Sequence, residues 1–215
     1  MSETSSKKRK LSLPLVLAGG VSSLVLALGM SPTFSAFTAQ ITNTLNTAGT
    51  GTLIMQEVGP GGTCLSTDNL PTGNTLGNNN TASCVTNNKY GGTTTLLVPG
   101  GALATTKVTI TNVGTLKAST FTLTGGACAQ TGTNGTTTDM CAKMNIKVYA
   151  AATATGTPIY TGTAAGLAGV PTTITGGLNA GSSQDFTFTV GLDTSAGNPY
   201  QGLGISQPLI WNFQA

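Results

Sequence analysis

The pattern that decides the fold is clearest in the stretch Lys107-Val108-Thr109-Ile110-Thr111-Asn112-Val113. Its apolar residues are β-branched and alternate with polar ones, and in a β-strand a period of two places the two sets on opposite faces. We expect Val108, Ile110 and Val113 to point into a core, while Lys107, Thr109 and Thr111 face water. One face of this strand is therefore predicted to cover the interior of a sheet protein.

The same alternation returns toward the C-terminal end. Phe186, Phe188 and Val190 alternate with Asp185, Thr187 and Thr189, and Ile205, Leu209, Trp211 and Phe213 close the chain in a similar way. Clusters of Gly, Pro and Asn separate such runs and predict turns. The predicted strands cover residues 52–58, 94–98, 107–112, 119–124, 145–150, 158–162, 172–175, 185–192 and 205–213. Nine short strands predict an all-β fold, a jelly-roll-like antiparallel β-sandwich.

The first 36 residues have the layout of an export signal. Four basic residues at 7–10 precede an uncharged, apolar run over 11–30, and small residues follow at Ser31, Ser35 and Ala36. This order is typical of a secretory signal peptide. We predict a signal peptide over 1–36 and a single domain over 37–215, with a retained N-terminal anchor as the alternative. In either case the rest of the chain is expected to be secreted or exposed at the cell surface.

The charge balance favours association and argues against nucleic-acid binding. The net charge of +3 belongs to the first 36 residues, because the remainder carries five Lys and five acidic side chains. No basic surface remains for phosphate contacts, so nucleic acid is not expected as a partner. A nearly uncharged surface rich in Thr, Ser, Asn and Gln lacks the repulsion that keeps proteins apart.

Four cysteines follow the export segment, and an even number in an oxidising compartment favours disulfides. Three pairings are possible. We favour Cys64 with Cys84 and Cys128 with Cys141, because each pair flanks a stretch rich in Gly, Asn and Thr that would otherwise be loose. A metal site is the alternative, but the spacings are long and the chain has no histidine. We expect neither a metal nor a cofactor.

Residues suited to catalysis are scarce. The lack of histidine removes the commonest general base and every Ser-His or Cys-His arrangement. None of the Gly-rich stretches has the order of a phosphate loop. The five carboxylates after residue 36 are scattered, which disfavours a glycosidase-type pair. We predict that the protein is not an enzyme, and a hydrolase acting through Asp139 or Asp185 is the minor alternative.

The stretch 59–92 is the longest without an apolar pattern. We expect it to form a surface excursion tethered by Cys64 and Cys84, where a ligand or partner would make contact. One functional hypothesis follows from this stretch: a monomeric surface adhesin or carbohydrate-binding module that contacts a glycan or a cell surface.

A series of short motifs runs through the chain in a fixed order. It consists of Phe34-Ser35-Ala36-Phe37-Thr38, Gly51-Thr52-Leu53, Leu97-Val98-Pro99-Gly100, Val108-Thr109-Ile110-Thr111-Asn112-Val113-Gly114, Phe121-Thr122-Leu123, Leu178-Asn179-Ala180-Gly181-Ser182-Ser183, Asp185-Phe186, Asn198-Pro199-Tyr200-Gln201-Gly202 and Trp211. In order and spacing, these motifs resemble TasA and camelysin-type proteins, whose signal peptides are removed by the SipW type of signal peptidase.

The resemblance implies a jelly-roll subunit that polymerises head to tail into extracellular fibres of a biofilm matrix or a pilus. It implies a signal peptidase as partner during export, and after that the chain itself as its own partner. It also implies that residues 37–47 of one subunit add as a strand to the sheet of the next. Phe37, Ala39, Ile41 and Leu45 alternate with polar residues there, as strand addition requires. The alternative is that residues 37–47 form the first strand of their own domain.

Two departures limit what the resemblance implies. This chain has four cysteines and fewer charges than TasA, so its loops and its contacts between subunits are expected to differ. Camelysin-like proteins have been classed as peptidases, but the zinc-binding motif expected of that activity is missing here. A peptidase activity is therefore not implied.

Overall fold

The computed structural model describes residues 47–68, 80–92, 96–133 and 135–215. The chain divides into two compact units, Met1–Ala48 and Gly49–Ala215, and every helix and strand named below belongs to the second. The predicted signal peptide lies outside the described residues, and so does the segment 37–47 apart from Thr47. Within the described residues, no helix has the length and apolar character that crossing a membrane requires.

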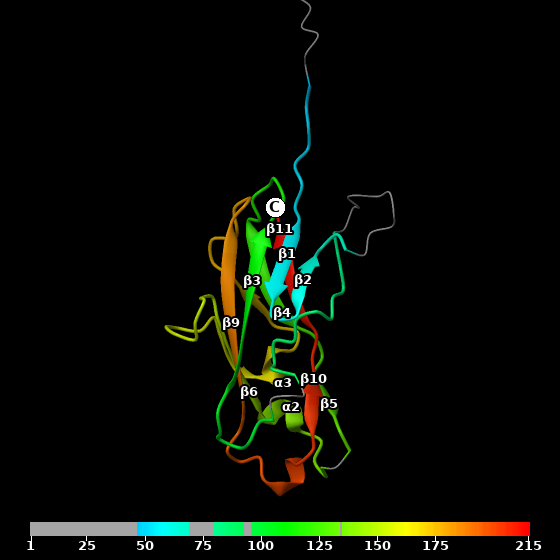
Figure 1. Ribbon diagram of the computed structural model, residues 1–215, viewed down its shortest axis with the longest axis vertical. Coiled ribbons are helices and arrows are strands. Elements are labelled where there is room, and N and C mark those ends of the chain that lie inside the picture. Colours follow the sequence, from blue (N-terminus) through cyan, green and yellow to red (C-terminus); the bar gives the residue numbers. More distant parts are fainter. Residues whose placement is uncertain (1–46, 69–79, 93–95, 134) are drawn as a thin grey trace, which may run out of the picture. The chain divides into compact units, whose positions relative to one another are not determined.

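The larger sheet has six strands, each paired antiparallel with its neighbours (Figure 1). Strand β9 lies between β3 and β6, and it places Phe186 opposite Val108 and Phe188 opposite Val148. In their order across the sheet, the strands are β2 (Gly62–Leu65), β1 (Met55–Gly59), β3 (Ala104–Asn112), β9 (Ser183–Leu192), β6 (Met144–Tyr149) and β7 (Tyr160–Thr163).

A smaller sheet packs against the first. Its order is β11 (Leu209–Gln214), β4 (Thr120–Gly125) and β8 (Pro171–Thr173), again antiparallel. Strands β5 (Ala129–Thr131) and β10 (Gly204–Ser206) form a separate two-stranded ribbon. The helical segments are α2 (Met140–Lys143), α3 (Ala164–Leu167) and η1 (Asn198–Tyr200). Two facing antiparallel sheets confirm the predicted all-β sandwich.

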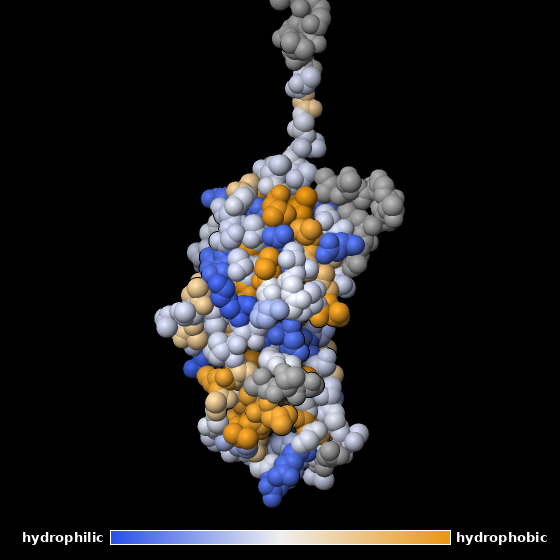
Figure 2. Space-filling model, in the orientation of Figure 1, coloured by the Kyte–Doolittle hydropathy of each residue, from blue (hydrophilic) through white to orange (hydrophobic). Residues whose placement is uncertain are grey.

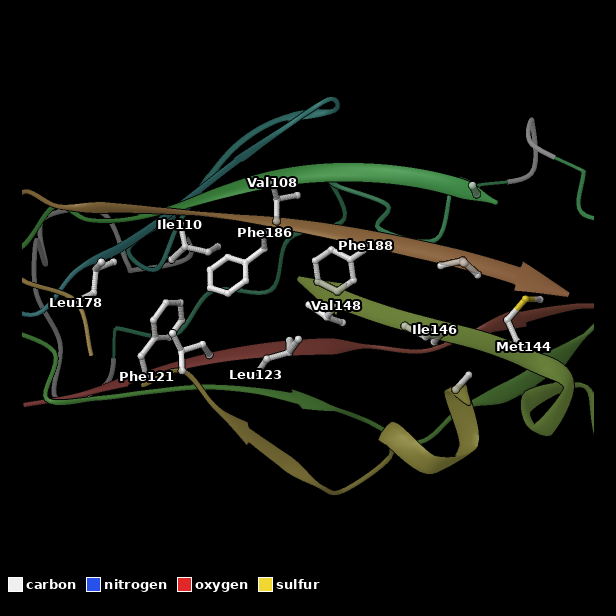
Figure 3. Close-up of a cluster of buried hydrophobic side chains, with 14 of the residues drawn as sticks. Val108, Ile110, Phe121, Leu123, Met144, Ile146, Val148, Leu178, Phe186 and Phe188 are labelled. Carbon is white, nitrogen blue, oxygen red and sulfur yellow. The ribbon is translucent and has the colours of Figure 1, made fainter. Parts of the chain in front are cut away.

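Aromatic rings fill the space between the two sheets. Phe121 of β4 meets Phe186 of β9 edge to face, with ring centroids 5.5 Å apart. Trp211 of β11 lies 4.6 Å from Phe186, and Phe213 lies 4.7 Å from Phe121. Phe121, Phe186 and Phe188 are completely buried, and Figure 3 shows them between the strands of the two sheets. The inward positions that alternation predicts for Phe186 and Phe188 are confirmed, and Trp211 and Phe213 pack against the same core while they stay partly exposed.

Strand β3 confirms the predicted alternation at two of its three apolar positions. Val108 and Ile110 are completely buried, but Val113 is 42% exposed and lies beyond the end of the strand. A strict period of two continues from Ile110 to Asn112, so Asn112 and not Val113 takes the next inward position.

Asn112 can be buried because both the nitrogen and the oxygen of its side-chain amide have hydrogen-bond partners. Its Nδ2 donates to the carbonyls of Leu116 at 2.8 Å and Leu178 at 3.1 Å, and its Oδ1 accepts from the amide of Gly114. These bonds fold the chain back after β3, and they satisfy an amide that would otherwise be expensive to bury.

The outer face of the larger sheet is less exposed than the sequence predicts. Thr187 and Thr189 were expected to face water, but they are only 2% and 5% exposed. The loop after β6 covers part of this face, and the Thr187 hydroxyl donates to the carbonyl of Ala151 at 2.8 Å. Elsewhere on the face, Lys107 and Asp185 form an accessible ion pair. Alternation alone does not reveal that a loop covers the polar face.

Several predicted strand boundaries are wrong. The described part of the predicted strand 94–98 has no strand, and only Pro99 makes an isolated bridge, to Leu192. The strand predicted over 205–213 is divided into β10 and β11 around Pro208, which has no amide hydrogen to donate. Strands β2 and β5 were missed because they are short and lack apolar alternation. A two-residue Pro-Gly turn joins β1 to β2, and Gly62 after it has a φ of 129°.

Candidate functional site

A groove with a volume of about 940 Å³ is lined in part by residues of β5, β10 and η1. Strands β5 and β10 lie side by side at one end of the sandwich (Figure 1). Residues from widely separated parts of the chain line the groove: the segment 84–92, the segment 96–99, α2 with the start of β6, the end of β9, and much of 196–209. The tertiary fold alone brings these parts together.

The floor of the groove belongs to the hydrophobic core. Met140, Met144 and Val190 line the groove, although each is at most 6% exposed. Figure 3 shows Met144 at the end of the core remote from Phe121. Methionine side chains are flexible and fill irregular spaces. The groove is therefore a place where the space between the sheets is open, with an apolar and adaptable floor.

Exposed apolar side chains stand at the mouth of the groove. Leu96 is 87% exposed and Val98 is 60% exposed, and both line the groove. Figure 2 shows hydrophobic residues gathered at this end of the unit. Apolar residues that are left in water beside a groove with an apolar floor favour a binding site.

The chain enters the unit at the opposite end of the sandwich. The amides of Thr115 and Val113 donate to the carbonyls of Thr52 and Ile54, so residues 52–54 lie beside the loop that follows β3. The start of β3 lies at the groove, because Ala104 pairs with the groove residue Val190. A nine-residue strand spans roughly 30 Å. The entry point and the groove therefore lie at opposite ends of β3.

Residues 84–92, which we call the wall segment, supply one side of the groove. Side chains tie this part of the chain to β1 and β2. Asn87 Oδ1 accepts from the amide of Gly61 and Asn87 Nδ2 donates to the carbonyl of Gly62. Part of the stretch 59–92, for which the sequence predicts contact with a ligand or partner, borders the groove as the wall segment. The contact itself stays a prediction.

A buried triad joins the wall segment to both sheets. Lys89 Nζ lies 2.7 Å from Glu57 Oε1, and Trp211 Nε1 donates to Glu57 Oε2 at 2.6 Å. The Lys89 and Glu57 side chains are only 9% and 12% exposed. The three residues come from the wall segment, β1 and β11, so the triad connects three parts of the fold at one point.

Tyr90 fastens the end of the wall segment. Its hydroxyl donates to Gln207 Oε1 at 2.7 Å, and Gln207 in turn donates to the carbonyls of Gly126 and Ala164. Burial, with a smaller effect of nearby Tyr160, raises the pKa of Tyr90 above its ordinary value. The phenol therefore keeps its proton and remains a hydrogen-bond donor.

The two acids considered for a hydrolase lie far apart. Asp185 is near the start of β9, where Thr109 and Lys107 bond it. Asp139 directly precedes α2, which runs into β6, and the first residue of β6 pairs with the last residue of β9. The fold therefore separates Asp139 from Asp185 by about the length of β9.

A polar cluster around Asp193 and Asp139 lies near the groove. Ser195 donates its hydroxyl at 2.6 Å and its amide at 2.9 Å to Asp193 Oδ1, and these bonds lower the pKa of Asp193 to about 2. The Tyr200 hydroxyl donates to Asp139 Oδ1 at 2.7 Å, which raises the pKa of Tyr200. Hydrogen bonds from Ser195 and Tyr200 therefore explain the positions of Asp193 and Asp139.

Both disulfides have the pairing that the sequence favours. Cys64 pairs with Cys84 and Cys128 pairs with Cys141, with Cα atoms 6.2 and 6.1 Å apart. The two disulfides indicate an oxidising compartment. Cys64, Cys84 and Asp68 have potential metal-ligand atoms within 4.8 Å of one another, but sulfurs joined in a disulfide are not thiolate ligands.

The four residues predicted for self-assembly lie outside the described residues: Phe37, Ala39, Ile41 and Leu45. The groove was not predicted from the sequence, because its lining comes from widely separated segments and mixes core residues such as Met144 with loop residues such as Asn87 and Gln201. One signal was available for the triad: Glu57 has the same alternation as Met55, which places a carboxylate on an apolar face. A charge in that position requires a partner.

No protein-family model matches the chain, and a search of curated proteins also finds no match. The resemblance to TasA and camelysin-type proteins therefore stays a prediction.

Proposed function

We propose that the chain is a secreted structural subunit that assembles head to tail into extracellular fibres of a biofilm matrix or pilus. Residues 37–47 of one subunit add as a strand to the next subunit, and their alternate apolar side chains enter its groove. The protein has no catalytic role in this function.

The observation that carries the proposal is the open apolar end of the sandwich. Met144 and Val190 form a floor that reaches the core, while Leu96 and Val98 stay exposed at its mouth. An inserted strand would cover these surfaces with its own side chains. Each Å² of apolar area removed from water would stabilise the complex by about 25 cal/mol. The segment 37–47 suits this role because it is uncharged and alternates.

The positions of the groove and the entry point support a head-to-tail arrangement. They lie at opposite ends of β3, with residues 52–54 at one end of the unit and the groove at the other. An interface between two different surfaces repeats from subunit to subunit and produces a ring or an open filament. Eleven residues in a strand span roughly 36 Å, which is enough to reach into a neighbour.

Composition supports the same function. Outside the first 36 residues the acidic and basic side chains balance, so subunits do not repel one another over long distances. Two disulfides suit a protein that works in an oxidising, extracellular environment.

The test is electron microscopy of two purified chains, residues 37–215 and residues 48–215. We expect filaments from the longer chain and monomers from the shorter one. A synthetic peptide of residues 37–47 should bind the shorter chain in calorimetry. The matched controls are two peptides: Ile41→Lys, which places a charge on the inserted face, should abolish binding, and Thr42→Lys, on the opposite face, should preserve it.

Filaments from the shorter chain would contradict strand addition by residues 37–47. Equal loss of binding by the two lysine peptides would contradict insertion of one face. A longer chain that stays monomeric at every concentration and binds a glycan would replace the fibre subunit with a surface adhesin.

A further inference from the structure

We propose that the buried triad of Glu57, Lys89 and Trp211 positions the wall segment, and that the affinity of the groove for an incoming strand depends on it. The inference rests on the proposed function, because it concerns the same groove. It assigns a role to the one buried ion pair among the described residues.

The triad stands where the groove meets the closed core. Lys89 and Tyr90 of the wall segment line the groove, and so does Leu209, two residues before Trp211 in β11. The Trp211–Glu57 hydrogen bond joins β11 to β1, and the Lys89–Glu57 ion pair joins the wall segment to β1. A single carboxylate therefore sets the spacing between two elements that both border the groove.

The geometry makes the three residues behave as one unit. Each oxygen of the Glu57 carboxylate has its own donor, the ammonium of Lys89 on one and the indole of Trp211 on the other. Removing one partner from such a buried pair leaves a charge without compensation, whereas removing both charges is often tolerated. Replacing Lys89 alone is therefore expected to disturb this part of the fold more than replacing Lys89 and Glu57 together.

The remaining fastenings of the wall segment lie on either side of the triad. The Cys64–Cys84 disulfide anchors its start, Asn87 bonds the β1–β2 turn, and Tyr90 bonds Gln207. These contacts hold the segment near its place when the triad is broken. We therefore expect a triad variant to fold, with a wall segment that is less well positioned. Preorganised binding surfaces bind more tightly because less ordering is needed on association.

The test uses residues 48–215, which include the whole compact unit with its own core, and compares Lys89→Met with Lys107→Met. Lys107 also pairs with an aspartate, but on the exposed outer face of the larger sheet. The readouts are thermal unfolding, affinity for the peptide of residues 37–47, and fluorescence of Trp211, the chain's single tryptophan.

We expect Lys89→Met to weaken peptide binding about tenfold or more and to change Trp211 emission, because Glu57 loses a partner. Lys107→Met should match the unmodified protein in both measurements. Lys89→Arg keeps the charge and should restore most of the affinity. The double variant Glu57→Gln with Lys89→Met removes both buried charges, so it should fold even if Lys89→Met does not. Its affinity for the peptide should stay about tenfold or more below that of the unmodified protein.

A folded Lys89→Met protein that binds the peptide as tightly as Lys107→Met would overturn the inference and leave the proposed function intact. Should the unmodified unit bind no peptide, the proposed function fails, and hydrogen exchange at residues 84–90 then decides the inference. Exchange at least about tenfold faster in Lys89→Met than in Lys107→Met would support the positioning role. Equal exchange would refute it.

Discussion

The two ends of the sandwich share strands β6 and β9, but they are packed differently. At one end, Phe186 of β9 meets Phe121 and Trp211 of the smaller sheet, and the rings fill the space between the sheets. At the other end, Val190 of β9 and Met144 of β6 form the floor of the groove.

The difference comes from what faces these strands. The closed end lies opposite β4 and β11, which pair over six residues. The open end lies by the three-residue ribbon of β5 and β10, beyond Pro208. A long paired sheet supplies large inward side chains at regular intervals, whereas a short ribbon does not. The closed end therefore holds the fold together, while the open end leaves apolar surface for a partner.

The largest effect is expected at the closed end. Phe186→Ala should destabilise the folded protein by about 4 kcal/mol, because the variant loses a fully buried ring and leaves a cavity between two sheets. Urea unfolding followed by circular dichroism measures this change. A loss below about 1 kcal/mol would show that the aromatic cluster is not the main support of the sandwich.

The next effect concerns the disulfide between Cys128 and Cys141, which joins the end of the loop that follows β4 to α2. Replacing Cys128 and Cys141 by Ser should cost roughly 3 kcal/mol, because their separation of 13 residues corresponds to a short closed loop in the unfolded chain. Thermal unfolding of the oxidised protein and the double variant provides the comparison. Identical unfolding temperatures for the two proteins would mean that this disulfide does not reduce the conformational entropy of the unfolded chain.

A smaller effect is expected at the floor of the groove. Met144→Ala should cost about 2 kcal/mol, the lower part of the range for such changes, because the groove already opens beside the side chain. Ile146→Ala, one inward position along the same strand and almost completely buried, should cost about 4 kcal/mol. Equal losses in urea unfolding would contradict the contrast between the open floor of the groove and the closed core beside it.

The smallest effect depends on pH. Hydrogen bonds from Ser195 lower the pKa of Asp193 from 3.8 to about 2 in the folded protein. Its contribution to stability is therefore present above pH 4 and disappears as the pH falls through about 2. Asp193→Asn should reduce stability slightly at pH 6, and the difference from the unmodified protein should vanish near pH 2 in acid-unfolding measurements. A difference independent of pH would exclude this origin.

The sequence was most informative where a local rule suffices. Alternation predicted the inward positions of Val108, Ile110, Phe186 and Phe188, and the composition between the cysteines favoured the pairing that is present. It failed at Val113, where the strand ends and Asn112 is buried by bonds to distant carbonyls. Local patterns contain no information about such partners.

By itself, the sequence determined the all-β class, because a period of two in apolar residues can bury one face only as a strand. It also determined that charge is scarce and that cysteines are positioned to pair. Only the tertiary structure decided where the core stays open and that Glu57, Lys89 and Trp211 meet, up to 154 residues apart in the chain. The physical reason is that a strand's faces follow from neighbouring residues, whereas a groove and a buried ion pair depend on which strands the whole chain brings together.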